Sequence, residues 1–258
     1  MIKSREFSLV LSGGGALGIA HLGVLSDLER ANIKPSEIVG TSMGGIIGAC
    51  YSIGLSEKEI YSHIESFSNI FNWLKFTFDG NSVVSSKKID EIFVKIFHDR
   101  KIKDTSIPLK LVATELESGD VRVFDKDDDV LIKDALLATM AIPGIFEPKI
   151  INKKVYVDGY LSANLPVNFS SYKQVLASDV LGMCSYDSEL PSSRLKIKNI
   201  IDMFEKSLKL LIINQTKEAI KTSNKDIKLI DIDTSDFQTY HFHKHKDLRV
   251  LGRGSVEG

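Results

Sequence analysis

The sequence has few cysteines and no long apolar run, and each shortage excludes a class of protein. Its two cysteines, Cys50 and Cys184, lie far apart and follow no metal-binding spacing, so a small disulfide-stabilised scaffold is excluded. The two could pair in principle, but free thiols in a reducing compartment are the simpler interpretation. The longest apolar runs fall well short of the roughly 18 residues that span a bilayer.

The chain also lacks an export signal and a net charge. Phe7–Leu11 is a mixed apolar run of five, whereas a signal peptide needs roughly 7–15 apolar residues and a small-residue cleavage site. The 33 basic and 34 acidic residues leave a net charge of −1, so no global basic field argues for a nucleic acid partner. We expect a soluble, cytoplasmic protein that could still touch a membrane from the side. The sequence does not indicate an oligomeric state.

The composition and the order of the elements are those of an α/β protein. The 258 residues are 43% hydrophobic and 26% charged, and no repeat or linker divides them, which favours one large domain. Two units of strand, turn and helix open the chain: Phe7–Leu11 with Leu17–Ala31, and Ile38–Gly40 with Gly45–Ile53. This order predicts a single three-layer α/β domain with a largely parallel central sheet. Further strands are expected at Leu109–Thr114, Val121–Phe124, Lys154–Val157, within Val175–Cys184 and at Ile227–Ile232, and further helices at Ser56–Ser68, Lys87–Phe97, Ile132–Met140 and Lys196–Lys221.

The segment Gly40–Gly44, of sequence GTSMG, fits the pattern Gly-x-Ser-x-Gly between an expected strand and an expected small-residue helix. A nucleophile elbow needs this context, because the serine sits on a strained turn and the flanking glycines let other backbone approach closely. Ser42 is therefore a candidate nucleophile. An ordinary tight turn with an N-cap serine is the alternative.

A glycine run, GGGALG at Gly13–Gly18, opens the first expected helix and can aim successive backbone N–H groups at a negative charge. Its spacing fits neither the dinucleotide-binding motif nor the P-loop. An oxyanion hole is the favoured interpretation, because a serine elbow follows. A phosphate cradle and a simple strand-to-helix turn are the alternatives.

Asp158-Gly159 follows the expected strand Lys154–Val157. A carboxylate at the end of a sheet strand points into the crevice where α/β folds bind ligands, and it could supply the base that a serine nucleophile needs. Partial burial would raise its pKa toward the range useful for a base. A turn aspartate is the alternative.

Together these motifs resemble, in order and context, those of the patatin-like phospholipases. The resemblance is carried by the glycine run, the serine motif, the segment ATMAIPG at 138–144 and Asp158-Gly159. The segments AHLGVL at 20–25 and NLPV at 164–167 agree as well. The resemblance covers roughly residues 7–185 of an expected domain over 5–250, in which a helix and a last strand fill 186–250 and residues 251–258 form a frayed tail.

The resemblance implies a patatin-like fold and a serine esterase that hydrolyses fatty-acyl esters of phospholipids or lysophospholipids, with no cofactor and no metal. It implies Ser42 as the nucleophile that forms an acyl-Ser42 intermediate, and Asp158 as its base. By motif, Gly13, Gly14 and Gly15 would form the oxyanion hole, supported by Gly18, Gly40, Gly44, Pro143 and Gly159. An acyltransferase with the same acyl-serine chemistry and a non-catalytic lipid-binding module are the rival functions. The chain departs from the family at Leu17, Tyr160 and Thr139, where members often carry a basic residue, a small residue and a serine.

Three histidines near the C-terminus, His241, His243 and His245, leave a Ser–Asp–His esterase as a rival mechanism, because they follow Ser42 and Asp158 in the order of an α/β-hydrolase triad. However, the serine comes before the several strands that usually precede such an elbow. The alternation of these histidines with Phe and Lys suits a solvated tail, and no cysteine or carboxylate completes a metal site around them.

Two segments could contact a bilayer: the aromatic stretch Phe67–Phe78 and the helix expected at Lys196–Lys221. Arg194–Lys221 carries seven basic residues against three acidic ones, and basic residues beside an apolar face suit anionic headgroups. Packing of both segments within the domain is the favoured interpretation, because any α/β domain needs such helices.

Overall fold

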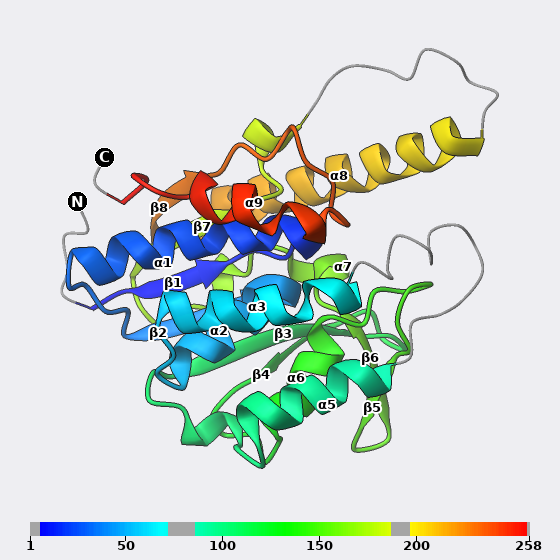
Figure 1. Ribbon diagram of the computed structural model, residues 1–258. Helices are drawn as coiled ribbons and strands as arrows, with labels where there is room; N and C mark the ends of the chain where they lie inside the picture. Colours follow the sequence, from blue (N-terminus) through cyan, green and yellow to red (C-terminus); the bar gives the residue numbers. More distant parts are fainter. Residues whose placement is uncertain (1–5, 72–85, 187–196, 257–258) are drawn as a thin grey trace.

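A mixed, mostly parallel sheet forms the centre of the molecule, with helices on both of its faces (Figure 1). The computed structural model describes residues 6–71, 86–186 and 197–256. The strands are β1 (Ser8–Leu11), β2 (Glu37–Thr41), β3 (Leu109–Glu115), β4 (Val121–Phe124), β5 (Lys149–Ile151), β6 (Lys154–Asp158), β7 (Gln174–Asp179) and β8 (Asp226–Asp231). They lie in the order β5-β6-β3-β2-β1-β7-β8, with β4 paired to β3. The expectation of a single α/β domain with a largely parallel sheet is confirmed.

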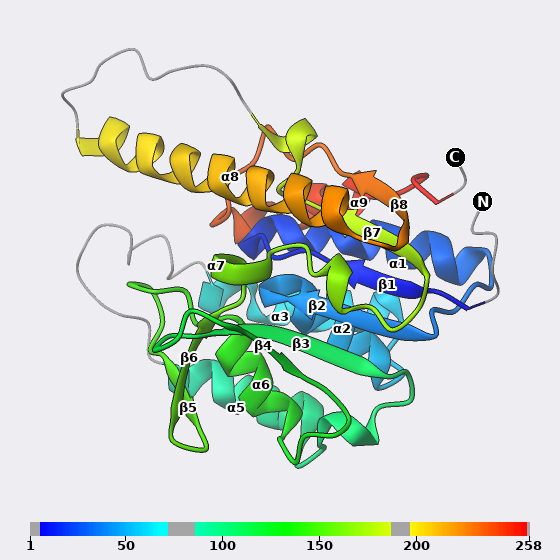
Figure 2. The ribbon, with the colours of Figure 1, turned by 180° about the vertical axis from the view of Figure 1, so that it is seen from behind.

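The helices divide between the two faces of this sheet. One face carries α1 (His21–Arg30), α2 (Ser42–Ser52), α3 (Glu57–Phe71), α5 (Ser86–Phe97), α6 (Ile132–Thr139) and α9 (His245–Leu251). The opposite face carries α7 (Tyr160–Ala163) and the long helix α8 (Ile197–Thr222), as Figure 2 shows. Short 3-10 turns complete the chain: η1 (Gly15–Ala20), η2 (Ile102–Asp104), η3 (Val167–Phe169), η4 (Met183–Ser185) and η5 (Phe242–Lys244).

Alternation along β1 divides the core into two layers. Leu9 and Leu11 lie in the larger cluster with the side chains of α1 and α2, whereas Val10 between them packs in a smaller cluster beneath α8. Successive side chains of a strand point to opposite faces, so a strand covered by helices on both sides is apolar throughout. This explains why Phe7–Leu11 is a continuous apolar run in the sequence.

Antiparallel pairing of β6 with β3 brings Asp158 to the end of β2. Thr41, the last residue of β2, is opposite Val112 of β3, and the next residue of β3, Ala113, is opposite Asp158. β2 and β6 lie on either side of β3 and run in opposite directions, and their last residues pair with adjacent residues of β3. The side chains that follow β2 and end β6 are therefore neighbours, although more than a hundred residues separate them.

The C-terminal segment differs from the sequence-based expectation. A frayed tail was expected over 251–258, but Leu251 and Val256 pack against the main core and Gly252 is buried. The N–H of Val256 also donates to Asp27 Oδ2 at 3.4 Å. The short helix α9 packs on α1, and this packing buries Leu248 completely. The segment that carries His245 is therefore part of the folded domain and not a solvated tail.

Two other features of the described residues bear on the expectations. Cys50 is buried and Cys184 exposed, and both are free thiols. In the part of the chain that the structure describes, every helix is too short or too polar to cross a membrane. Of the aromatic stretch Phe67–Phe78, residues 72–78 lie outside the described residues.

Candidate active site

Ser42 occupies a sharp turn between β2 and α2. Its φ angle is +52°, in the left-handed region that non-glycine residues rarely adopt, and such strain is typical of functional sites. The turn is tight enough that a Cβ on Gly40 would lie 2.7 Å from Gly45 Cα, so glycine is required there. The N–H of Ser42 donates to Thr139 Oγ1 at 2.9 Å, and the Thr139 hydroxyl donates in turn to the carbonyl of Val112. This geometry has the features that the nucleophile-elbow hypothesis requires.

Asp158 faces Ser42 directly. The Ser42 hydroxyl donates to Asp158 Oδ2 at 2.7 Å, and the N–H of Tyr160 donates to Oδ1 at 2.9 Å. The carboxyl group is wholly buried, and this burial raises its pKa to about 7, although the two hydrogen bonds act in the opposite direction. A carboxylate with a pKa near neutrality can both take and return a proton at physiological pH.

The end of α6 and the residues that follow it accept hydrogen bonds from the backbone of Asp158 and Gly159. The N–H of Asp158 donates to the carbonyl of Ala141 at 3.0 Å, and that of Gly159 donates to the carbonyl of Thr139 at 3.3 Å. Pro143 then begins the turn that leads the chain away, in which Gly144 has a φ of +83°. The motif at 138–144 thus positions both members of the candidate dyad.

The glycine run lies beside Ser42, and only some of its backbone N–H groups donate hydrogen bonds within the protein. Gly13 differs from the expectation, because its N–H donates to the carbonyl of Asn164 at 3.2 Å instead of facing an open site. The N–H of Ala16 donates to the carbonyl of Thr239 at 2.7 Å. Within the described part of the chain, the N–H groups of Gly14 and Gly15 make no hydrogen bond. Gly14 and Gly15 are therefore the candidate oxyanion donors, and Gly13 holds the loop in place.

Close packing leaves no room for side chains on this loop. A Cβ on Gly14 would lie 2.5 Å from Val180 Cγ2, and one on Gly18 would lie 2.5 Å from Met43 Cγ. Gly15 has a φ of +55°, which a glycine adopts without strain. The motif glycines Gly44 and Gly159 likewise lie against the backbone of β1 and β3, so these positions hold the segments of the site together.

His21 is a structural histidine behind the glycine run. Its Nε2–H donates to the carbonyl of Ser12 at 2.9 Å, and its Nδ1 then accepts from the Ser178 hydroxyl at 2.8 Å. Burial lowers the pKa of His21 to about 4, so the ring is neutral. It joins the ends of β1 and β7 at the start of the loop.

Two of the three C-terminal histidines are hydrogen-bonded to groups other than the candidate dyad. His245 Nδ1 pairs with the Tyr61 hydroxyl at 2.8 Å, and His241 Nδ1 accepts from the N–H of Gln238 at 3.1 Å. In a triad a histidine bridges the serine and the aspartate, whereas here the two are hydrogen-bonded to each other. Among the described residues, no group of three or more His, Cys, Asp or Glu side chains is arranged to hold a metal ion.

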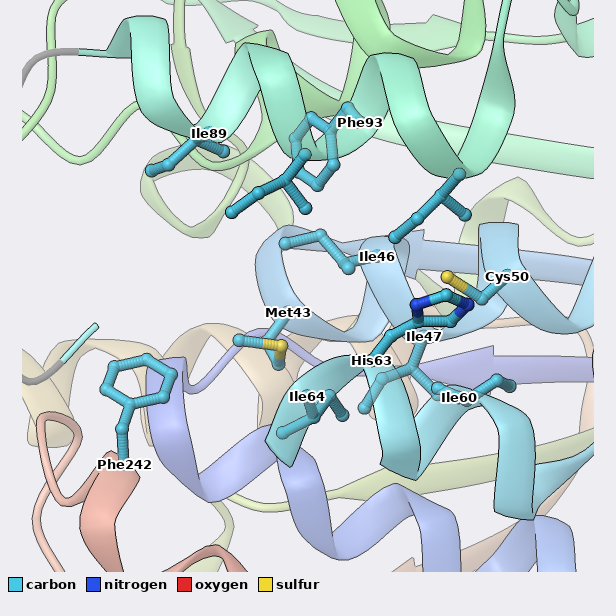
Figure 3. Close-up of a pocket in the computed structure, with 12 residues that line it drawn as sticks. Met43, Ile46, Ile47, Cys50, Ile60, His63, Ile64, Ile89, Phe93 and Phe242 are labelled. Atoms are coloured by element: carbon cyan, nitrogen blue, oxygen red, sulfur yellow. The ribbon is translucent and has the colours of Figure 1, made fainter. Parts of the chain in front are cut away.

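An apolar cavity begins next to the candidate nucleophile. It has a volume of about 40 Å³ and is lined by side chains of α2, α3 and α5, including Met43, Ile46, Ile64 and Phe93, and by Phe242 of η5. Figure 3 shows these side chains pointing toward one another, with Met43 between Phe242 and Ile46. Sequence patterns indicated the apolar faces of the three helices but not that they enclose a shared space.

Comparisons with known proteins identify the family of the chain. The family model described as patatin-like phospholipase matches residues 9–169. The human patatin-like phospholipase domain-containing protein 6 is 27% identical over 190 residues, which cover 70% of this chain and 14% of that protein. The lysophospholipase NTE1 of Candida albicans is 27% identical over 188 residues, which cover 70% of this chain and 13% of that protein.

A solved structure shares the fold over nearly the whole chain. VipD from Legionella pneumophila matches with a TM-score of 0.55 and 12% sequence identity, over 98% of this chain and 66% of that one. The family model spans more than half of the chain and includes Ser42, Asp158 and the glycine run. The chain therefore belongs to the patatin-like phospholipase family.

Proposed function

We propose that this chain is a serine esterase that hydrolyses fatty-acyl ester bonds of phospholipids or lysophospholipids. The observation that carries the proposal is the 2.7 Å hydrogen bond from the Ser42 hydroxyl to a buried Asp158, beside free backbone amides and an apolar cavity. A serine hydroxyl is a weak nucleophile until a positioned base accepts its proton, and this arrangement supplies that base. The Candida albicans relative is named a lysophospholipase, which supports this class of substrate.

The reaction that we propose has two halves. Ser42 Oγ attacks the ester carbonyl carbon while Asp158 accepts the hydroxyl proton, and negative charge develops on the carbonyl oxygen near the N–H groups of Gly14 and Gly15. Collapse of this intermediate breaks the bond to the alcohol, which leaves with the proton held by Asp158. Water then attacks the acyl-Ser42 ester, again with Asp158 as base, and releases the fatty acid.

The apolar cavity supports an acyl chain as the part of the substrate that is bound. Its lining includes Met43, the residue after the nucleophile, so the cavity lies on the side of α2 that begins at Ser42 and could receive a chain attached to the reacting carbonyl. Burying methylene groups among apolar side chains stabilises a complex by roughly 0.8 kcal/mol for each group. Among the described residues, the lining holds no Lys, Arg, Asp or Glu, so we place the headgroup outside this cavity.

The test measures the products released from a mixture of phospholipids and lysophospholipids, analysed by mass spectrometry with no added acyl acceptor. We expect free fatty acid from the intact protein and none from Ser42→Ala. An acyltransferase would instead release little fatty acid until an alcohol acceptor is added. A protein that consumes none of these lipids, with or without an acceptor, would contradict the proposed function.

We also propose that α7 and α8 contact the lipid surface. Exposed apolar side chains gather on these helices beside the Asp158 turn: Leu161 is 44% exposed, Leu210 41% and Leu211 65%. Leu161 and Leu211 lie near each other, since Gln215, one turn beyond Leu211, donates to the carbonyl of Leu161 at 3.3 Å. The helix α8 carries five lysines against three acidic residues, and lysines beside apolar side chains suit anionic headgroups.

Sedimentation with vesicles tests this surface. Replacing Leu210 and Leu211 by serine should reduce binding to vesicles that contain phosphatidylserine, whereas Val94→Ser, at a similarly exposed position of α5, should not. Equal binding by both variants would contradict a membrane role for α8.

A further inference from the structure

Asn164 carries a buried side-chain amide that the proposed mechanism does not use. The residue is fully buried, and neither Oδ1 nor Nδ2 has a hydrogen-bond partner among the described residues. Buried amides are nearly always hydrogen-bonded, because leaving such a group unpaired costs free energy. An unpaired amide in a native structure therefore calls for a functional explanation.

The amide lies next to the candidate nucleophile. A methyl group on Gly13 would sit 2.7 Å from Asn164 Oδ1 and 3.2 Å from Ser42 Cβ, so both side chains pack against Gly13 and lie close to each other. The two ends of an asparagine amide have nearly the same shape, and a half-turn of the group presents Nδ2 instead of Oδ1 on this side. The end of the Asn164 amide that faces Gly13 and Ser42 can thus carry the hydrogen-bond donor.

The backbone around Asn164 is fixed on three sides. The N–H of Asn164 donates to Gln215 Oε1 at 2.7 Å, and its carbonyl accepts the N–H of Gly13 at 3.2 Å. One residue earlier, the carbonyl of Ala163 accepts from Thr41 Oγ1 at 2.8 Å. Segments that carry the nucleophile, the glycine run and α8 therefore hold this peptide, which fixes the backbone from which the side chain of Asn164 extends.

We propose that Asn164 is a further catalytic residue, which donates a hydrogen bond from Nδ2 to the substrate carbonyl oxygen as it becomes negatively charged. This inference rests on the proposed esterase function. An oxyanion accepts several hydrogen bonds, and a donor fixed beforehand in a buried site stabilises it without reorganisation. Asn164 would add one side-chain donor to the backbone donors at Gly14 and Gly15.

Kinetics of two variants on a short-chain soluble ester test the role. Asn164→Leu removes the amide while keeping a similar volume, and we expect kcat to fall by about 10² to 10³, the scale for loss of one oxyanion donor, with KM changed less than about threefold. Thr216→Val is the matched control. Thr216 also has a buried, unpartnered side-chain oxygen, but it lies on α8, and its variant should keep full kcat.

A second measurement separates catalysis from structure. A trifluoromethyl ketone forms a tetrahedral adduct with a serine nucleophile, and its affinity should fall in Asn164→Leu by about the same factor as kcat, while that of an uncleavable ether analogue should not change. If Asn164→Leu does not fold, Asn164→Asp, which keeps the shape, should show at least the same loss, because an ionised carboxylate lacks the donor and also repels the oxyanion.

The outcomes are distinct. Wild-type kcat in the Asn164 variants, or a raised KM with unchanged kcat, would overturn the inference while leaving the esterase function in place. Absence of turnover in the unaltered protein would instead overturn the proposed function, and the role of Asn164 with it.

Discussion

Titration of Asp158 should control both the activity and the stability of the protein. Burial raises its pKa from 3.8 to about 7. Below that pH the carboxyl group is protonated and cannot accept the proton of Ser42, so kcat/KM should fall about tenfold for each pH unit below 7 and reach a plateau above it. At pH 5 we therefore expect about 1% of the plateau value.

The raised pKa of Asp158 makes stability change with pH in the opposite direction to activity: activity rises with pH, whereas stability falls. The folded state holds the proton of Asp158 more tightly than the unfolded state, so the stability contributed is full below pH 4 and is lost as the pH rises from about 4 to 7. A shift of about three pKa units corresponds to roughly 4 kcal/mol at 1.36 kcal/mol for each unit. Asp158→Asn cannot ionise and escapes this loss. The variant should therefore be inactive yet more stable than the unaltered protein at pH 8, and no more stable at pH 4.

Two assays check these expectations. The pH profile of kcat/KM is measured on a short-chain soluble ester, and urea unfolding of the protein and of Asp158→Asn is compared at pH 4, 6 and 8. Taking the difference between the two proteins at each pH cancels the titration of every other group. A flat activity profile between pH 5 and 8, or a stability difference that does not grow with pH, would refute the argument that Asp158 is a buried base.

Three further predictions concern the rest of the site. Ser42→Ala and Asp158→Asn should each reduce ester hydrolysis by about 10³-fold or more, whereas His241→Ala, His243→Ala and His245→Ala should be nearly silent; loss of activity in one of the histidine variants would revive the triad. Gly14→Ala should reduce kcat by about 10² to 10³ with little change in KM, because its Cβ would push against Val180 and displace the N–H. Adding Val180→Ala should restore part of the activity, and an unchanged kcat in folded Gly14→Ala would make the glycine run a simple turn. Activity should survive EDTA, and inhibition that calcium reverses would contradict a metal-free mechanism.

Local patterns in the sequence were sufficient to identify the candidate dyad and most of the elements. The elbow and the glycine run are each contained in a few consecutive residues, and their backbone requirements select glycine directly. Asp158 was placed by a rule for parallel strands, whereas β6 is antiparallel to β3. Its position at the end of β2 follows from register, which depends on pairing across the sheet and not on the residues around Asp158.

Contacts between distant segments explain what sequence reasoning did not predict. The N–H of Gly13 donates to the carbonyl of Asn164, which lies 151 residues later in the chain. The residues around Gly13 in the sequence do not indicate that partner. The alternation of histidines with Phe and Lys predicts a solvated tail for this segment, but Phe242 and Leu248 are buried. A few apolar side chains at suitable spacing are enough to anchor a short segment, and composition alone does not reveal them.

The N–H of Ala16 donates to the carbonyl of Thr239, so the glycine run depends on a residue that is synthesised more than 200 residues later. Protein chains emerge from the ribosome from the N-terminus, so Ser42 and Asp158 are both outside well before residue 239 follows. Until then the glycine run lacks the partner that fixes its helical end, and α9 is not yet available to cover η1. We expect a nascent chain that ends before residue 239 to hold both members of the candidate dyad but not the final conformation of the candidate oxyanion loop. The glycine run would thus reach its final conformation only after residue 239 has been synthesised.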